Sequence, residues 1–462
     1  MLAIVGAGWA GMAAAVQAAS HGMDVTIFEA TRVLGGRARA LPAHRPDGMP
    51  LTLDNGQHIL IGAYRDTLAL MRQVEMDPSE HLLALPLMLP YPDGSGLRTP
   101  EWAARWPAPL DALAAIATAR DWRWRDRFAL LRISMAWKRS GFACPPTHTV
   151  ADVCRGLPVR VMNELIEPLC VSALNVPVQQ ASGDVFLRVM RDALFGPGSH
   201  GFNASSLLLP RSDLSALFPL AAAAWLKKSH GQHTRIRMGT RVRGLRAAGA
   251  QWLLRTEEKE EAEEAFDQVI WATSASPAAQ VMGQAIDAPD TLRSWAGSAE
   301  QLPFTAITTV YAWAKGARLA SPLLALRDGP AQFVFDRGQL DPANPAAQGV
   351  LAFVVSASQG EREALQARVL AQAESTLHLP SLQALQTVVE KRATFACVPG
   401  VHRPAACIAP GLWAAGDYVQ GPYPATLEGA VRSGLQAAAG TSSHAGVPTC
   451  AIQQPDERNL SG

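Results

Sequence analysis

The sequence predicts an α/β fold built around a Rossmann-like parallel sheet, and three patterns in the 462-residue chain support this prediction. Near the N-terminus, an apolar run at 2–5 is followed by closely spaced glycines, an Ala-rich stretch and a second apolar run at 25–28. Near the C-terminus, we expect a buried strand within 412–419 and a helix from Thr426, where apolar residues recur with a period of about 3.6. Between these ends, helical and extended patterns alternate over a length that suffices for two domains.

The first glycines form a GxGxxG pattern, Gly6, Gly8 and Gly11, directly after the first predicted strand. In that context the first glycine permits a tight turn, the second lets a pyrophosphate approach the backbone, and the third lets helix and strand pack closely. The N–H groups at the helix start, near Ala10, then attract phosphate. Glu29 ends the second strand and can accept hydrogen bonds from ribose hydroxyls. This order predicts dinucleotide binding; a glycine-rich turn in another α/β sheet is the alternative.

A second glycine motif follows in the stretch ATRVLGGRARA, which contains Gly35, Gly36 and Arg37. It resembles the GG motif of the flavin-dependent amine oxidase and phytoene desaturase superfamily. The resemblance implies FAD, with both glycines close to the dinucleotide and Arg37 near its pyrophosphate. Ala40 stands where the family pattern usually has Ser or Thr, so one side-chain hydrogen bond is absent. The implied fold is a GR2-type, Rossmann-like FAD-binding domain, discontinuous in sequence, with an interleaved α+β substrate domain and a helical cap.

The C-terminal motif is GDYVQGPYPATLEGAVRSG, residues 416–434. In the superfamily this last motif closes over the ribityl and ring end of FAD. The resemblance implies that Gly416 and Asp417 contact the ribityl chain, and that a helix starting at Thr426 and Leu427 points its positive end at the flavin. We interpret the small residues on that helix as room for the flavin, with plain helix packing as the alternative. The motif contains no Cys or His, so non-covalent FAD is expected.

The stretch DNGQHILIGAY, residues 54–64, contains Gly56, Gln57 and His58 and by resemblance passes beside the flavin ring. Together with YPATLEGAVRSG and SLLLPRSDLSALFPLAAAAWL (206–226), it resembles the squalene-associated FAD-dependent desaturases, understood as hydroxysqualene dehydroxylases of hopanoid biosynthesis. His58 is the candidate proton donor, because an unperturbed histidine titrates near neutrality. Gln57 is a candidate ring-orienting amide. The alternative for His58 is a structural histidine bonded to loop backbone.

The resemblance implies reductive removal of the allylic hydroxyl of hydroxysqualene, with hydride from reduced FAD, to give squalene. An oxidative carotenoid desaturase is one alternative. A non-catalytic FAD-binding partner of a squalene-synthase complex is another alternative. Contact with squalene-pathway synthases is compatible both with an enzyme and with such a partner. No motif in the chain names the reductant.

Composition divides the chain into alternating segments. We assign 1–70, 225–285 and 400–440 to the FAD-binding domain, 71–224 and 286–399 to the substrate domain and its cap, and 441–462 to a disordered tail. Val242 lies in a strand pattern within 240–273 and, as in relatives, is expected to meet the adenine. The acidic run EEKEEAEEAF in the same pattern is expected to be a solvated hairpin tip.

The region 102–139 mixes tryptophan with arginine and lysine. Five of the 12 tryptophans lie inside one stretch of 36 residues in this region: Trp102, Trp106, Trp122, Trp124 and Trp137. Such a mixture suits the headgroup layer of an anionic membrane. The alternative is a helical cap with tryptophan in its core and solvated arginine.

The charge and the cysteine content exclude some classes of partner and cofactor. The formal net charge of +1 gives no argument for nucleic acid, and the six scattered cysteines lack metal-ligand spacing. We therefore expect no metal, and free thiols in a reducing cytosol. The family resemblance implies a hydrophobic isoprenoid as substrate. Together with the tryptophan and arginine region, it leads us to expect a cytoplasmic protein held peripherally on the inner face of the cytoplasmic membrane.

Overall fold

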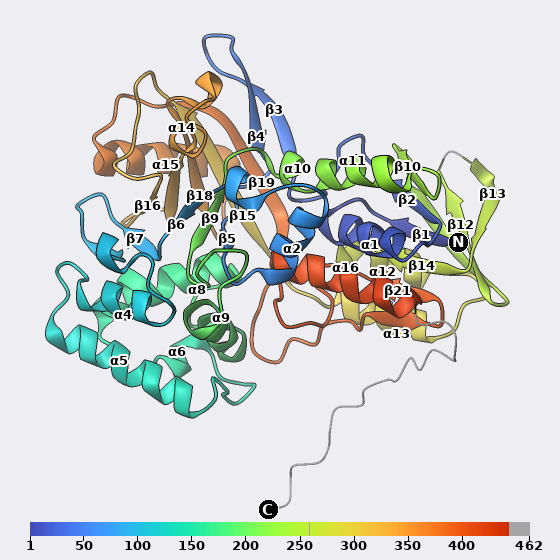
Figure 1. The fold of residues 1–462 in the computed structure, drawn as a ribbon, viewed down its shortest axis with the longest axis horizontal. Helices are drawn as coiled ribbons and strands as arrows, with labels where there is room; N and C mark the ends of the chain where they lie inside the picture. The colour runs from blue at the N-terminus through green and yellow to red at the C-terminus, as the bar shows by residue number, and fades with distance from the viewer. Residues whose placement is uncertain (258, 443–462) are drawn as a thin grey trace, which may run out of the picture.

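The protein is described by a computed structural model that covers residues 1–257 and 259–442. The molecule is elongated, with a parallel sheet at one end and an antiparallel sheet and helical cap at the other (Figure 1). The last helix extends to Ser442, so the predicted tail begins later than 441; residues 443–462 lie outside the described part. None of the described helices combines the length and apolarity needed to cross a bilayer.

The parallel sheet has six strands drawn from three distant parts of the chain. In spatial order they are β10 (Thr234–Met238), β2 (Val25–Glu29), β1 (Leu2–Val5), β14 (Gln268–Trp271), β21 (Leu412–Ala414) and β20 (Cys407–Ala409). Neighbours are parallel except for β20, which runs antiparallel at the edge. Every residue of β1 and β14 is buried, as expected for strands covered on both faces. The predicted discontinuous Rossmann-like sheet is confirmed.

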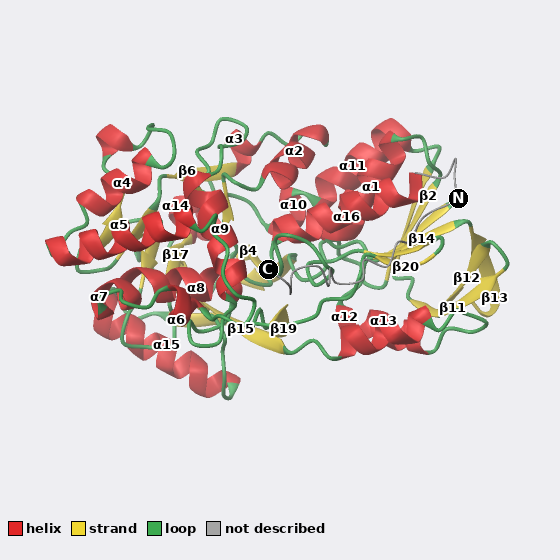
Figure 2. Ribbon diagram, turned by 90° about the horizontal axis from the view of Figure 1, so that it is seen from below, coloured by secondary structure: helices red, strands yellow, loops and turns green. Residues whose placement is uncertain are grey.

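Helices cover both faces of this sheet (Figure 2). One face carries α1 (Trp9–Ser20), α11 (Pro219–His230) and α16 (Leu427–Ser442), and the other carries α12 (Ala275–Gly283) and α13 (Thr291–Glu300). The predicted boundary between residues 224 and 225 falls inside α11, so the chain joins this end of the molecule earlier than its composition indicates.

A small antiparallel sheet projects beside the parallel one and consists of β11 (Val242–Ala248), β12 (Gln251–Thr256) and β13 (Lys259–Phe266). The acidic run is therefore mostly a strand, and the prediction of a solvated hairpin tip is wrong. Glu263 pairs with Arg246 and Glu264 with Arg237. Arginines on other strands pair with these carboxylates and so favour a strand here. A count of like charges along the chain does not reveal these partners.

The other end of the molecule contains a five-stranded antiparallel sheet. Its spatial order is β16 (Leu323–Ala325), β17 (Phe333–Asp336), β18 (Val350–Val355), β15 (Phe304–Trp313) and β19 (Gln383–Phe395). Helix α15 (Arg362–Leu377) packs against β19. Three smaller sheets connect this end to the rest: β3 (Ala40–His44) with β4 (Pro50–Asp54), β5 (Leu60–Ile61) with β9 (Leu207–Pro210) and β6 (Leu82–Leu85), and β7 (Met88–Pro90) with β8 (Gly96–Arg98).

The remaining elements are mostly short, and many of them form the cap. They are α2 (Arg65–Gln73), α3 (Pro78–His81), η1 (Glu101–Ala103), α4 (Leu110–Ala117), α5 (Trp124–Arg139), α6 (Val150–Val153), α7 (Val159–Val161), the π-helical η2 (Met162–Ile166), α8 (Glu167–Leu174), α9 (Gly183–Phe195), α10 (Leu214–Leu217), α14 (Arg337–Leu340) and η3 (Pro345–Ala347).

The tryptophans of the cap divide into two groups. Trp122 and Trp137 are buried, and their indole N–H groups donate to Glu164 at 3.0 Å and to the Val153 carbonyl at 2.9 Å. Trp102, Trp106 and Trp124 are exposed. Two of the five tryptophans expected at a membrane interface therefore belong to the core. There the aromatic ring is buried and the indole N–H has a hydrogen-bond acceptor.

The small residues of α16 face α1. A Cβ on Gly434 would lie 2.1 Å from the Ala10 carbonyl oxygen, so only glycine permits this approach of the two helices. Val431, Ala437 and Ala438 are fully buried in the same contact layer. Helix packing thus accounts for most of the small face, which corrects the interpretation of that face as room for the flavin. Ala430, one turn earlier, does line the cavity described below.

Replacing Gly434 by Ala should destabilise the protein, because the added methyl has no space beside α1. We expect the free energy of unfolding to fall by roughly 1–3 kcal/mol, the usual cost of overpacking. Gly297→Ala is the matched control, because a Cβ at this helical glycine of α13 meets nothing within 4 Å. It should be neutral or stabilising. Denaturant unfolding of both variants checks this, and equal stabilities would contradict the packing argument.

Candidate functional site

A cavity of about 1030 Å³ runs from the glycine loops at the parallel sheet into the helical cap. Nearly all residues predicted for the site line it. They are Gly6, Gly8, Ala10, Glu29, Gly35, Gly36, Arg37, Gly56, Gln57, His58, Val242, Gly416, Asp417, Thr426 and Leu427. Gly11 lies behind the cavity, where a Cβ would sit 1.9 Å from the Gly6 carbonyl oxygen, so its role is close packing of helix and strand, as predicted.

The two glycine motifs lie side by side at the start of α1. Gly35 forms a parallel bridge with Gly8, and its N–H donates to the Ala7 carbonyl at 3.0 Å. Gly36 has a φ of +63°, and a Cβ there would lie 3.2 Å from the Gly8 Cα. Gly8 itself has a φ of −74°, and a Cβ on it would meet nothing closer than 3.8 Å. The protein alone therefore does not require glycine at position 8.

Glu29 is buried at the cavity wall, where backbone groups fix its carboxylate. The Ala7 N–H donates to Oε2 at 2.8 Å, and the Thr31 N–H and hydroxyl both donate to Oε1 at 2.8 Å. A carboxylate offers about four lone-pair sites, so an acceptor position is left for a ligand hydroxyl. The carboxylate is thus oriented before any ligand binds.

Arg37 and Asp417 come from opposite ends of the chain and form an ion pair with each other. The guanidinium also donates to the Ala393 carbonyl on β19. Arg37 thus joins the parallel-sheet end to the antiparallel sheet. Both side chains line the cavity, so the positive and negative charges predicted for a dinucleotide site meet there.

The start of α16 reaches the cavity as predicted, with Thr426 as its N-cap: the Thr426 hydroxyl accepts from the Gly429 N–H at 3.0 Å. Glu428 is fully buried, and its carboxylate accepts from the Asp66 and Thr67 N–H groups at 3.1 and 3.0 Å. This carboxylate caps the start of α2, which stabilises the free N–H groups there. The starts of two helices are therefore fixed together at the cavity.

His58 and Gln57 both line the cavity. The Nδ1 atom of His58 is 2.8 Å from the Gly56 carbonyl oxygen, which places the proton of the neutral ring on Nδ1. Burial, together with the charge of Arg37, lowers the pKa of His58. The Gln57 amide oxygen accepts from Arg337 at 3.3 Å. His58 therefore makes the backbone bond expected of a structural histidine and also faces the cavity.

A buried ion pair supports this loop from behind. Asp54 Oδ2 lies 3.0 Å from Arg337 Nη1, and both side chains are almost fully buried. The Leu214 N–H donates to Asp54 Oδ1 at 2.7 Å, and the Tyr311 hydroxyl donates to the Asp54 carbonyl at 2.9 Å. Burial raises the pKa of Asp54 to about 6, against the opposing charge of Arg337. The pair ties the loop 54–58 to α14, α10 and β15.

Apolar side chains from the cap and from the antiparallel sheet line part of the cavity. They include Leu97, Ile116, Leu130, Leu165, Val189 and Phe335, each from a different element. This half of the cavity offers a long ligand hydrophobic contact along its length.

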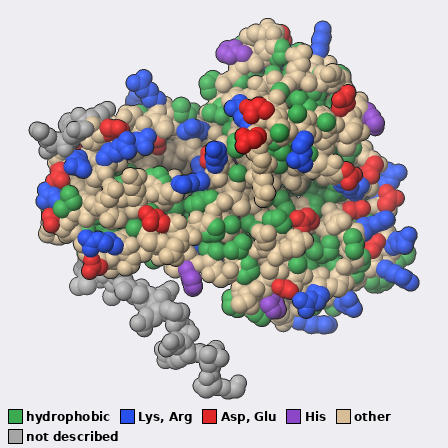
Figure 3. Space-filling view, turned by 180° about the vertical axis from the view of Figure 1, so that it is seen from behind, with side chains coloured by type: hydrophobic (Ala, Val, Ile, Leu, Met, Phe, Trp, Pro, Cys, Tyr) green, Lys and Arg blue, Asp and Glu red, His purple; other side chains and the backbone are tan. Residues whose placement is uncertain are grey.

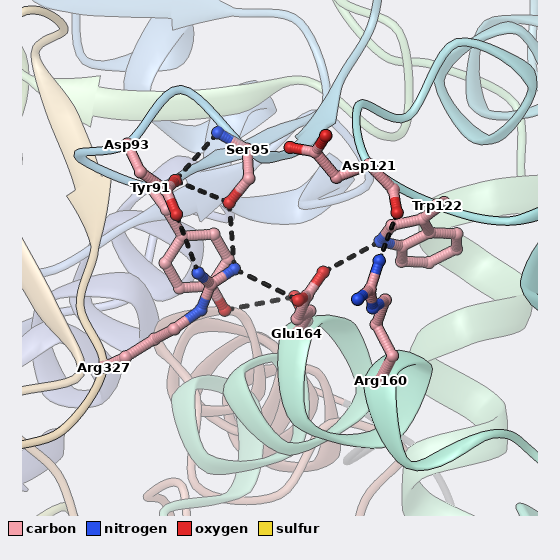
Figure 4. Close-up of polar contacts among 8 residues, drawn as sticks. All are labelled: Tyr91, Asp93, Ser95, Asp121, Trp122, Arg160, Glu164 and Arg327. Atoms are coloured by element: carbon pink, nitrogen blue, oxygen red, sulfur yellow. Dashed lines mark hydrogen bonds and ion pairs between the residues drawn. The ribbon is translucent and has the colours of Figure 1, made fainter.

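A polar cluster joins the cap to the antiparallel sheet (Figure 4). Arg327, which follows β16, stacks on Tyr91 with its guanidinium carbon 3.6 Å from the ring centroid. The same guanidinium donates to Asp93 at 3.1 Å and to Ser95 at 3.0 Å. Stacking and hydrogen bonding together use the planar form of arginine, which lysine lacks.

The cluster continues to the cap through Glu164, which lies 3.3 Å from Arg327 and accepts from the Trp122 indole at 3.0 Å. Glu164 belongs to the π-helical turn η2, a rare conformation that occurs often at functional sites. The next two residues, Leu165 and Ile166, line the cavity. The cluster therefore fixes one wall of the apolar half.

Many residues that line the cavity were not singled out from the sequence, and Tyr64, Asn175 and Lys391 are three polar examples. Asn175 ends α8 in a left-handed conformation, and its amide donates to Thr305 at 2.8 Å and to Thr394 at 3.1 Å. An Asn directly after an apolar helix signals this C-terminal conformation. Tyr64 ends the quoted 54–64 stretch. Lys391 lies inside the long strand β19 and carries no local signal.

The parallel sheet, the glycine loops and the adjoining cavity define a protein with a Rossmann-like cofactor-binding fold. Residues 9–440 match the family described as flavin containing amine oxidoreductase, and the chain belongs to this family. The protein is therefore a flavin-dependent oxidoreductase. Within the described residues, no cluster of His, Cys, Asp and Glu is arranged to hold a metal ion.

Individual relatives extend this assignment. The chain is 25% identical over 454 residues to a hydroxysqualene dehydroxylase of Zymomonas mobilis, covering 96% of this chain and 99% of that protein. It is 25% identical over 490 residues to a hydroxysqualene dehydroxylase of Rhodopseudomonas palustris, covering 94% and 96%. Its fold is similar to that of an oxidoreductase from Methanosarcina mazei, with a TM-score of 0.67, 14% identity, and 94% and 99% coverage.

The cavity fits a flavin dinucleotide on structural grounds. Gly8 has ordinary backbone angles and open space at its Cβ position, so the protein itself does not require glycine there, whereas a phosphate bound against the backbone would. Gly8 caps α1 without a side-chain hydrogen bond, which leaves the first N–H groups of the helix to a phosphate.

Replacing Gly8 by Val should give folded protein that lacks flavin, because the side chain would fill the cradle without disturbing its neighbours. Gly421→Ala is the control, since a Cβ at Gly421 meets nothing closer than 3.9 Å and lies away from this cradle. Visible absorbance measures the bound flavin, and circular dichroism measures the fold. A Gly8→Val protein with a full complement of flavin would refute the assignment of the cradle.

Proposed function

We propose that the protein is an FAD-dependent enzyme that removes the hydroxyl group of hydroxysqualene reductively to give squalene. The observation that carries the proposal is one continuous cavity, lined by Gln57 and His58, that includes both the glycine loops and apolar side chains of the cap. The full-length similarity to proteins named hydroxysqualene dehydroxylase supports the same substrate. When bound, reduced FAD supplies the hydride that replaces the hydroxyl, which leaves as water after gaining a proton.

The residues proposed to hold FAD lie along the polar half of the cavity. Gly8 and Gly36 would admit the pyrophosphate, and Glu29 would accept from the ribose beside Val242. Asp417 would accept from the ribityl chain, and the start of α16 at Thr426 would face negative charge on the ring. The motif 416–434 contains no Cys or His, so binding is non-covalent in this proposal. Acid denaturation should then release all flavin into the supernatant.

His58 is proposed to deliver the proton and Gln57 to orient the ligand. The Gly56 carbonyl holds the His58 ring in place, and Arg337 holds the Gln57 amide. Because burial lowers the pKa of His58, its protonated form releases the proton more readily than an exposed imidazolium. The apolar half of the cavity excludes water from the hydrocarbon chain of the substrate. This exclusion favours proton transfer from a positioned group.

Purified protein with chemically reduced FAD should convert hydroxysqualene to squalene in one anaerobic turnover. Flavin reoxidation and extracted product are measured together, and their amounts should match. Absence of squalene would overturn the proposal. Conversion of a carotenoid precursor by oxidised protein would indicate an oxidative desaturase, and binding of FAD without any turnover would indicate a non-catalytic partner.

The His58→Ala variant should bind FAD and reoxidise it with hydroxysqualene at least about 100-fold more slowly, the usual contribution of a positioned acid. The wild-type rate should decline as pH rises, with a midpoint below the ordinary histidine value of about 6.5, because burial lowers the pKa. His402→Ala, at an exposed histidine, is the control. A His58→Ala rate within a few-fold of wild type, with flavin retained, would leave His58 a purely structural role.

A further inference from the structure

Large apolar side chains lie uncovered on the outside of the cap. Trp124 is 68% exposed, Phe128 64% and Met135 54%, and these three residues recur along one face of α5. The segment 102–110, which precedes α5 in the cap, carries further exposed aromatic and aliphatic residues. We call the whole group the aromatic face: Trp102, Trp106, Leu110, Trp124, Phe128 and Met135. Apolar side chains gathered in this way mark a contact surface rather than scattered exposure.

Exposed cations lie on and beside the aromatic face, and two of the four nearby carboxylates are buried. Arg123 and Arg125 flank Trp124 and are exposed. Asp126 is buried and accepts from the Arg123 N–H at 2.9 Å, and Asp111 is buried against the Ser205 hydroxyl. Figure 3 shows Lys and Arg side chains beside hydrophobic ones along its right-hand side, the end formed by the cap. The segment thus presents mainly positive charge outward, although Glu101 and Asp121 are also exposed.

The same helices line the cavity with their inner faces. Ile116 of α4 and Leu130 and Trp137 of α5 line the apolar half of the cavity. A helix with its side chains is about 10 Å thick, so only this thickness separates the aromatic face from the chamber. Both helices are therefore apolar on two sides, whereas a surface helix ordinarily carries one apolar stripe.

We propose that the aromatic face docks the protein onto an anionic lipid bilayer. Tryptophan favours the headgroup level, and arginine is attracted to anionic lipid. A second copy of the chain fits this surface poorly, because a symmetric contact would place the same cation-rich patch on both sides of the interface. Docking also brings the chamber next to the phase that dissolves apolar molecules. The binding itself does not depend on the reaction proposed above.

Flavin-loaded protein should co-float with vesicles of phosphatidylglycerol and much less with vesicles of phosphatidylcholine. Raising the ionic strength to about 1 M should release a large share of it, because charge attraction is then screened within about 3 Å. Absence of binding to phosphatidylglycerol vesicles at low salt would overturn the proposal.

Two variants test which residues carry the binding. Trp124→Ala with Phe128→Ala should weaken vesicle binding at least about tenfold, since two exposed aromatic anchors are lost. Arg123→Gln with Arg125→Gln should weaken it by about fivefold per cation and reduce its salt dependence. Both proteins should keep their flavin, because none of the four side chains lines the cavity.

The matched control is Leu220→Ala with Ile286→Ala, two exposed apolar residues (49% and 51%) outside the aromatic face. It should bind vesicles like wild type, and an equal loss in the control would overturn the assignment of the face. Sedimentation velocity gives the remaining outcome. A wild-type dimer that dissociates in the Trp124→Ala, Phe128→Ala protein would identify a second copy as the occupant and would also overturn the proposal.

Discussion

Contact between backbones, made at glycine residues, holds the two ends of this chain together. Gly11 lets α1 rest on the turn after β1, and Gly434 lets α16 rest on α1. Any side chain at either position would push the layers apart, since the nearest carbonyl oxygens lie 1.9 and 2.1 Å from the Cβ positions. Because α16 begins beside α1, its first turn reaches the same cavity as the glycine loops. The cofactor half of the site is therefore a product of close packing between segments about 400 residues apart in the sequence.

The buried pair of Asp54 and Arg337 connects this half to the substrate half. An ion pair taken out of water contributes little net stability, yet removing one partner leaves an uncompensated buried charge. Here the pair also has a directional use, since Arg337 reaches Gln57 and the Asp54 carboxylate binds the start of α10. The loop 54–58, which lines the cavity, is thereby held by groups that cannot easily exchange partners. A hydrophobic contact at this position would not fix the orientation of the Gln57 amide.

The sequence predicted the parts of the fold whose signals are local. The strand, the glycines and Glu29 follow one another within 29 residues, and each carries its own physical reason. It did not separate Trp122 and Trp137 from Trp102 and Trp124, because a tryptophan beside an arginine looks the same whether its indole meets a carboxylate or solvent. The acidic run failed for a similar reason: the arginines that pair with Glu263 and Glu264 lie on other strands. The extent of α11 across the expected boundary was missed because its alanines suit either lobe. Domain limits and the roles of His58 and Gln57 stay predictions.

The position of α16 has a consequence for how the chain is made. The apolar layer on α1 is complete only when Val431, Ala437 and Ala438 pack against it, and these residues follow α1 by more than 400 positions. At about 5–20 residues per second, the emergence of α16 follows that of α1 by roughly 20–80 s. During this time the surface of α1 that α16 covers has no native partner. The N-terminal segment therefore cannot reach its final state until α16 has emerged from the ribosome.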